Sequence, residues 1–207
     1  MPEDAPSPAP APPPATDAEV PPAPEAASPP ASPPAASSPS EAEAKHPKPR
    51  PPGEPAEIVE LRELIEAELA KLVEMYGAHG GSYLLGFQSA RVFVVPAALE
   101  SGATVIRVFA ITNVDVPVSA GLNEYLVTKN LDFVCGSFAL DAEHGAVWFN
   151  HNLLGKFAQP EELQATIVMI AETADRFDDE IKSTFGGRLY AESPDQAIAP
   201  PNTPGYL

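Results

Sequence analysis

The distribution of proline divides this chain into a part that cannot form a hydrophobic core and a part that can. Residues 1–55 hold 20 of the 27 prolines, and Val20 is their only valine, isoleucine, leucine or phenylalanine. All 15 aromatic residues follow residue 55. A segment so poor in apolar side chains buries too little surface to offset the ordering entropy of its backbone, about 1–2 kcal/mol per residue. Since proline becomes frequent again after Glu192, we predict a disordered tail over 1–55, a folded domain over 56–192 and an extended arm over 193–207.

The net charge of −17 bears on the partners of the chain. An acidic protein repels phosphate backbones and anionic lipid head groups, so we expect neither nucleic acid nor membrane as a partner. The longest apolar run, Val92–Leu99, has eight residues, far fewer than the roughly 20 that cross a bilayer. The N-terminus lacks the basic and apolar regions of a signal peptide. We therefore expect a cytoplasmic protein.

Three segments carry helix signals. Apolar residues recur every three or four positions from Glu57 to Tyr76, with Gly77 as the expected stop, and again along a helix that begins at Pro160 and closes at Gly186. Ser119 can cap a shorter helix that ends near Asn130. The two long stripes predict amphipathic helices that need an apolar partner surface.

Five segments rich in β-branched and aromatic residues predict strands: Tyr83–Phe87, Arg91–Val95, Thr104–Thr112, Phe133–Leu140 and Ala146–His151. The short links between them favour antiparallel pairing. We predict an α+β fold in which a five-stranded antiparallel sheet is packed with helices in the order α-β-β-β-α-β-β-α.

Both faces of the predicted sheet are apolar. In Thr104–Thr112, alternate residues place valine, isoleucine or phenylalanine on each side. Two helices can cover one face, so the other face needs either a further element of the same chain or another polypeptide, and both alternatives remain open. We predict that a client segment binds to apolar strand residues of this sheet: Phe93, Val95, Val147 and Phe149.

The residue types that carry out catalysis do not occur in a recognisable pattern. There is no glycine-rich phosphate loop and no pair of histidines at the spacing of a zinc protease. Cys135 lies within a predicted strand and is expected to pack in the core. Glu172, Asp175 and Asp179 share a helix face, which we interpret as solvated, although carboxylates so spaced can hold a hard cation. We predict no enzymatic activity, no cofactor and no metal.

Several stretches together resemble a known family: Asn123–Val127, Phe138–Asp141, Val147–Gly155 and Ala171–Asp175. With the predicted element order, they resemble type III secretion chaperones of the CesT kind, the YbjN proteins, and more closely a group of peptide-binding chaperones of high-GC bacteria akin to both (TY-Chap type). The likeness covers about residues 57–192.

The resemblance implies a non-enzymatic, acidic homodimer that offers apolar surface to an extended segment of a client protein. In the secretion chaperones the middle helix and the neighbouring strand form the dimer, which here implies an interface at Leu122, Tyr125, Leu126 and Phe133. The likeness to YbjN leaves an alternative, a signalling regulator that senses a small ligand or a divalent cation.

Overall fold

The computed structural model describes residues 52–79 and 81–192. Nearly all of the predicted tail and the whole predicted arm, 193–207, therefore lie outside the described residues. The described part is an α+β structure with an antiparallel sheet, which confirms the predicted class. Its elements follow one another as α1 (Ala56–Leu72), β1 (Gly77–His79), β2 (Ser82–Phe87), β3 (Ala90–Ala98), β4 (Thr104–Val114), α2 (Ala120–Lys129), β5 (Ser137–Asp141), β6 (Ala146–Leu154), the 3₁₀ turn η1 (Gly155–Phe157), α3 (Pro160–Phe185), β7 (Arg188–Leu189) and η2 (Tyr190–Glu192).

The sheet has seven strands, so the predicted number of five and the predicted element order are wrong. The strands lie in the order β1-β2-β3-β4-β6-β5, and β7 pairs with the end of β4. The two additional strands, β1 and β7, have only three and two residues. Such short strands are too brief to produce an alternating pattern in the sequence.

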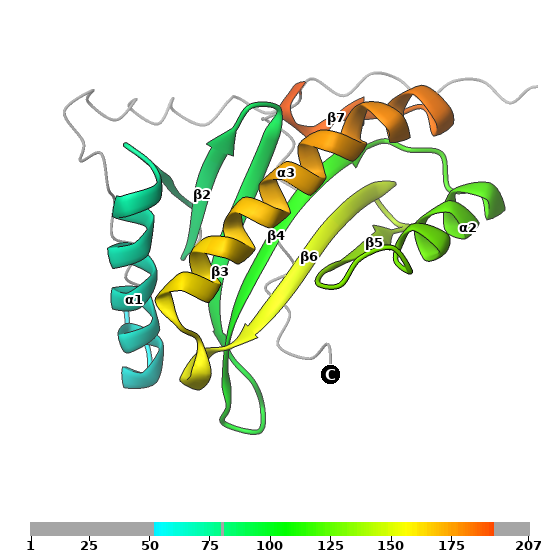
Figure 1. Cartoon of the computed structure of the whole chain (residues 1–207). Helices are drawn as coiled ribbons and strands as arrows, with labels where there is room; N and C mark the ends of the chain where they lie inside the picture. Colours follow the sequence, from blue (N-terminus) through cyan, green and yellow to red (C-terminus); the bar gives the residue numbers. More distant parts are fainter. Residues whose placement is uncertain (1–51, 80, 193–207) are drawn as a thin grey trace, which may run out of the picture. The chain divides into compact units, whose positions relative to one another are not determined.

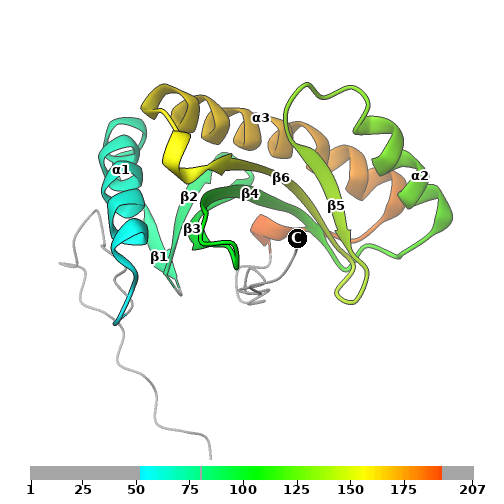
Figure 2. The same cartoon turned by 90° about the horizontal axis from the view of Figure 1, so that it is seen from below.

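The helices lie against one face and the two ends of the sheet (Figure 1). α3 crosses the face formed by β3, β4 and β6, while α1 contacts α3 and β3. α2 lies at the other end, beside β5. Figure 2 shows η2 on the side of the sheet opposite α3. We call the side under α3 the helix face and the opposite side the second face.

The α3 helix follows its sequence signals closely. Pro160 occupies its first turn, and Gln159 and Glu162 form a capping box. The helix ends at Gly186, whose φ of +84° suits glycine. Its predicted apolar stripe is buried throughout, in agreement with the prediction: Leu163, Ile167, Ile170, Ala174, Phe177 and Ile181.

The first helix is shorter than predicted. α1 ends at Leu72 because the backbone of Val73 is extended, with φ −137° and ψ 148°. Tyr76 is still buried, and its ring packs edge-to-face on that of Tyr83 at 5.5 Å. Gly77 begins β1 and does not terminate a helix.

The predicted alternation along β4 is confirmed, and both faces carry apolar residues. Ile106, Val108 and Ala110 belong to the core beneath the helices. On the second face lies a separate group, the second-face cluster, which is already buried in the single chain: Phe93, Phe109, Ile111, Val114, Ala146, Trp148 and Tyr190. Since Tyr190 belongs to η2, a further element of the same chain covers part of this face.

Cys135 is exposed, so the prediction that it packs in the core is wrong. The strand expected from Phe133 begins only at Ser137, and Cys135 lies in the bend before it. The next residue, Gly136, has a φ of +78°, and a Cβ there would lie 2.8 Å from the ring of Phe149. The backbone conformation that glycine permits at this point delays the start of the strand.

Candidate functional site: an apolar pocket beside the second face

The four residues predicted to bind a client lie on opposite sides of the sheet. Val147 and Phe149 are completely buried in the core that the helices cover. Phe93 belongs to the second-face cluster, and Val95 is half-buried against it. Val147 and Phe149 therefore cannot line an open surface, because α3 covers their side of β6. Phe93 and Val95 remain predictions.

The residues predicted for a dimer interface point mainly into their own protomer. Leu122 and Leu126 are buried in the core, and Tyr125 is partly buried against it. Phe133 contacts the rings of Phe138, Phe149 and Phe177. Leu122 and Leu126 therefore do not lie on the surface, where a dimer interface would need them, because the apolar stripe of α2 packs into the core.

Other apolar residues around α2 are exposed. We call Val127, Leu131 and Val134 the α2–β5 patch, since they follow one another from α2 into the loop before β5. Their exposed fractions are 67%, 84% and 100%. Sequence reasoning assigned α2 to an interface but chose its inward residues, because a buried stripe and an interface stripe are equally apolar in sequence.

An apolar hollow beside the sheet lies between α1, the β3–β4 turn and η1. We call it the α1–η1 pocket; its volume is about 550 Å³. Leu154 and Phe157 are 60% and 65% exposed at this pocket. Its lining is apolar with a small number of charged or polar groups: Glu57, Glu60, Leu61, Leu64, Gly102, Ala103, Thr104, Leu154, Gly155, Lys156 and Phe157.

The absence of a side chain at Gly155 brings η1 into close contact with the other walls of the pocket. A Cβ at this position would lie 2.7 Å from both Leu61 Cδ1 and Thr104 Oγ1. Only glycine lets η1 approach α1 and β4 so closely. Sequence reasoning missed the pocket because it ended the strand at His151, whereas β6 continues to Leu154. The feature of the sequence that could have indicated the pocket is a pair of apolar residues just beyond the predicted strand, Leu154 and Phe157.

The pocket adjoins one end of the second face. Leu154 lies opposite Val105 in the register of β4 and β6, and Asn152 lies opposite Arg107. Arg107 in turn lies opposite Val95 of β3. Because residues two apart in a strand share a face, these side chains form a continuous track from the pocket along the second face.

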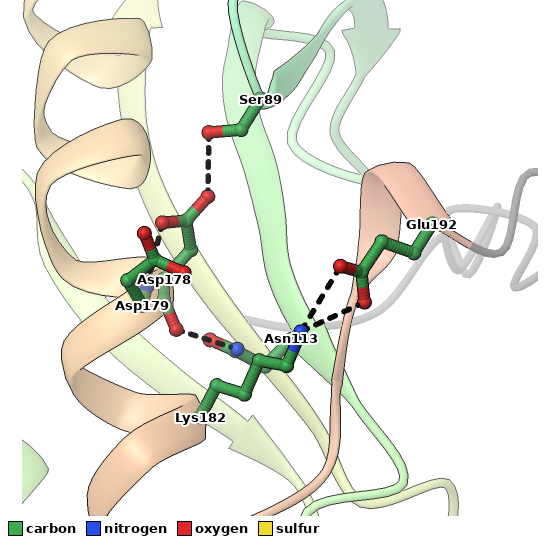
Figure 3. Close-up of polar contacts among 6 residues, drawn as sticks. All are labelled: Ser89, Asn113, Asp178, Asp179, Lys182 and Glu192. Atoms are coloured by element: carbon green, nitrogen blue, oxygen red, sulfur yellow. Dashed lines mark hydrogen bonds and ion pairs between the residues drawn. The ribbon is translucent and has the colours of Figure 1, made fainter.

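The acidic residues in the second half of α3 form hydrogen bonds with neighbouring elements of the fold (Figure 3). Asp178 is 3% exposed, and its Oδ2 lies 2.7 Å from the hydroxyl of Ser89. The same hydroxyl lies 2.5 Å from Asp175 Oδ1, and Asn113 Nδ2 donates to the backbone carbonyl of Asp178 at 2.8 Å. Burial raises the pKa of the Asp178 carboxyl. These contacts join the β2–β3 turn and β4 to α3.

The cation-sensing alternative gains no support from this arrangement. Among residues 52–79 and 81–192 there is no group of three or more His, Cys, Asp and Glu side chains placed to hold a metal ion. In the same residues, each helix is too short or too polar to span a bilayer.

Comparison with known proteins gives one family. The family model TY-Chap1, described as "T3SS (YopN, CesT) and YbjN peptide-binding chaperone 1", matches residues 59–193. The match takes in most of α1 and every later described element. A search of curated proteins finds no match.

Proposed function

Since the chain belongs to the TY-Chap1 family of T3SS and YbjN peptide-binding chaperones, we propose that it is a peptide-binding chaperone or adaptor, which holds an extended segment of a client protein. The observation that carries the proposal is the α1–η1 pocket, where apolar side chains remain exposed beside the end of a sheet. No residue is assigned a catalytic role, and the proposed compartment is the cytoplasm.

The chemistry of the pocket suits one apolar side chain of a client. Leu61 and Leu64 line it from α1, and Leu154 and Phe157 line it from the opposite wall. Burying a leucine- or phenylalanine-sized side chain stabilises a complex by about 1.5–3 kcal/mol. A few polar groups at the margin then fix the orientation of the ligand, as is usual in ligand pockets.

The client backbone continues from the pocket over the adjoining track. Asn152 is exposed and Arg107 half-buried there, so both can contribute to binding an extended chain. Val95, half-buried beyond Arg107, supplies a second apolar contact. In this proposal Phe93 supports the track from the second-face cluster, and Val95 keeps its predicted role in contacting the client.

We further propose that the protein forms a homodimer through the α2–β5 patch. Three large apolar side chains within eight positions of sequence are exposed here, and exposed apolar surface of this kind is what a protein partner can cover. A twofold contact between two copies buries the patch against itself. The α1–η1 pocket lies at the α1 end of the domain and the patch at the α2 end, so the dimer leaves both pockets accessible.

Peptide arrays test the client proposal directly. The full-length protein is applied to overlapping 15-residue peptides that cover a bacterial proteome, and bound protein is measured at each peptide. We expect binding to peptides that carry a large apolar residue. For Phe157→Ser we expect the affinity to fall at least tenfold, which corresponds to about 1.4 kcal/mol of binding free energy.

A matched control separates pocket binding from general adhesion of apolar surface. Met75→Ser removes an apolar side chain of equal exposure, 65% for both Met75 and Phe157, at a position outside the pocket lining and outside the α2–β5 patch. This variant is expected to bind like the wild type. Equal losses in both variants, or none in either, would show that the pocket is not the client site.

A further inference from the structure

The α1 wall of the α1–η1 pocket is acidic as well as apolar. Glu57 and Glu60 line the pocket together with Leu61 and Leu64. Both glutamates are exposed, whereas Leu61 is buried and Leu64 half-buried. Because residues three positions apart on a helix are neighbours on its surface, the two carboxylates lie side by side at an apolar hollow.

Neither carboxylate is neutralised by the described part of the chain. The two basic residues of α1 both pair with other carboxylates. Arg62 is 3% exposed, and its Nη2 lies 2.7 Å from Glu54 Oε1; Lys71 Nζ lies 2.6 Å from Glu68 Oε1. Among residues 52–79 and 81–192, no ion pair includes either pocket glutamate.

The cation that lines the pocket is on the wall opposite α1. Lys156 belongs to η1, and its Nζ lies 6.0 Å from the centroid of the Phe157 ring. Within the described ranges this ammonium group forms no ion pair with α1. The lining therefore carries two negative charges on α1, a positive charge on η1, and apolar side chains on both walls.

This arrangement of charge favours a partner that brings a cation to the α1 wall. Like charges at neighbouring positions of a helix repel each other, and Glu63, which is also exposed, extends the acidic series by one turn. A lysine or arginine of a bound segment relieves this repulsion and donates charge-assisted hydrogen bonds to the carboxylates. The aliphatic part of such a side chain can lie along the exposed part of Leu64.

We propose that the client segment of the α1–η1 pocket is both apolar and basic: a large apolar residue enters the hollow, and a nearby lysine or arginine pairs with Glu57 and Glu60. In an extended chain, side chains two residues apart point to the same side and lie about 7 Å from each other. The expected pattern is therefore an apolar residue with a basic residue two positions away. This inference rests on the proposed function, because it assigns the sequence preference of the same site.

Three synthetic peptides of fifteen residues, with both termini blocked, test this preference. Each has phenylalanine at its fourth, eighth and twelfth positions in a background of glycine and serine. The sixth and tenth positions are both lysine in one peptide, both serine in the second and both glutamate in the third. The two lysines flank the central phenylalanine, so one of them lies beside α1 in either direction of the chain.

Fluorescence anisotropy measures the binding of each labelled peptide to the full-length protein. At about 20 mM salt we expect the lysine peptide to bind about fivefold more tightly than the serine peptide, and the glutamate peptide to bind least tightly. At about 500 mM salt the three affinities are expected to converge, because screening weakens the ion pairs and leaves the apolar contact.

Variants of the protein separate recognition at the pocket from the effect of overall charge. Glu57→Lys/Glu60→Lys is expected to reverse the order of the three peptides. Glu57→Gln/Glu60→Gln, a milder change, is expected to abolish most of the preference for lysine over serine. The matched control is Glu74→Lys/Glu143→Lys, which alters the net charge as much as the first variant does, at two exposed glutamates outside the pocket lining. The control is expected to keep the wild-type order.

The inference is wrong if the wild type binds the three peptides equally, or if the control variant loses the preference as fully as the pocket variants do. Phe157→Ser distinguishes this failure from a failure of the proposed function, because it removes apolar contact and is expected to weaken all three peptides alike. Binding that is unchanged in Phe157→Ser would show that the pocket is not the client site. Binding that depends on Phe157 but is equal for the three peptides would contradict the basic preference alone.

Discussion

The side-chain amide of Asn130 forms both hydrogen bonds that a neighbouring strand would form with Phe138. Its Nδ2 donates to the Phe138 carbonyl at 3.1 Å, and the Phe138 N–H donates to its Oδ1 at 2.6 Å. In an antiparallel sheet, one residue of the adjacent strand exchanges the same two bonds. Asn130 is the C-cap of α2, which fixes its position. It thereby occupies the outward backbone groups of Phe138 on the outer edge of β5, a type of edge that otherwise invites pairing with other chains.

The first prediction concerns this closure. Asn130→Ala removes two hydrogen bonds, so the free energy of unfolding is expected to fall by about 1–3 kcal/mol. The freed edge is also expected to increase self-association. Urea denaturation and sedimentation velocity measure the two effects. The control is Asn123→Ala, on the exposed side of α2; unchanged stability in Asn130→Ala would show that the side chain does not protect the edge.

The second prediction concerns the pH dependence of the Ser89 contacts. The Ser89 hydroxyl has a single hydrogen, yet it lies within hydrogen-bond distance of Asp175 and Asp178. When the Asp178 carboxyl is protonated, it can donate to Ser89 while Ser89 donates to Asp175. Burial, together with the charges of Asp179 and Asp175, raises the pKa of Asp178 above its ordinary value of 3.8.

The raised pKa of Asp178 determines how the stability of the fold changes with pH. A raised folded-state pKa stabilises the fold below about pH 3.8, and this contribution is lost as the pH rises through the folded-state value. In Asp178→Asn, the new amide donates to Ser89 at every pH, and its oxygen still accepts from the Asp179 N–H. We expect the variant to exceed the wild type in stability by about 1 kcal/mol at pH 7 and by less at pH 4. Urea denaturation of the variant and the wild type at pH 7 and at pH 4 measures this difference in stability. A difference that is the same at both pH values would contradict the prediction.

The third prediction compares two glycines with nearly equal backbone angles. Gly187 has φ +83°, and a Cβ there would lie 2.7 Å from the Val114 carbonyl oxygen; Gly102 has φ +80° and open space around it. Gly102→Ala is expected to cost about 1 kcal/mol from the backbone conformation alone. Gly187→Ala is expected to cost at least about 1 kcal/mol more, because β7 must move away from β4. Thermal unfolding measures both, and equal losses would contradict the close packing of β7.

The fourth prediction concerns the proposed dimer. Leu131→Asp/Val134→Asp places two charges in the α2–β5 patch, so the protein is expected to behave as a single chain in light scattering at concentrations where the wild type is a dimer. Met75→Asp, at a residue that is 65% exposed near the end of α1, is the control and should remain a dimer. A single-chain mass for the wild type at micromolar concentrations would contradict the dimer itself.

The sequence allowed the class of fold and its long elements to be predicted, because burial imposes a period on them. The stripe from Leu163 to Ile181 and the alternation along β4 are both found in the structure. The strands β1 and β7 were missed because two or three residues cannot show a period. The extent of β6 was underestimated because Asn150 and Asn152 interrupt its apolar pattern, although both lie in the strand.

The candidate site was predictable only in part, since alternation assigns residues to two faces but does not say which face the helices cover. Phe93 and Phe149 appear equivalent in sequence, yet α3 lies over Phe149 and not over Phe93. The α1–η1 pocket depends on three segments distant in sequence and on the close approach that Gly155 permits. Such a contact between distant segments leaves no local pattern.

The most direct test of the account is hydrogen–deuterium exchange of the full-length protein, with and without the peptide that binds most tightly on the array. The account predicts slower exchange at 102–104 and 154–157, the two segments that frame the α1–η1 pocket opposite α1. Slower exchange confined to α2 and β5, with those two segments unchanged, would contradict it.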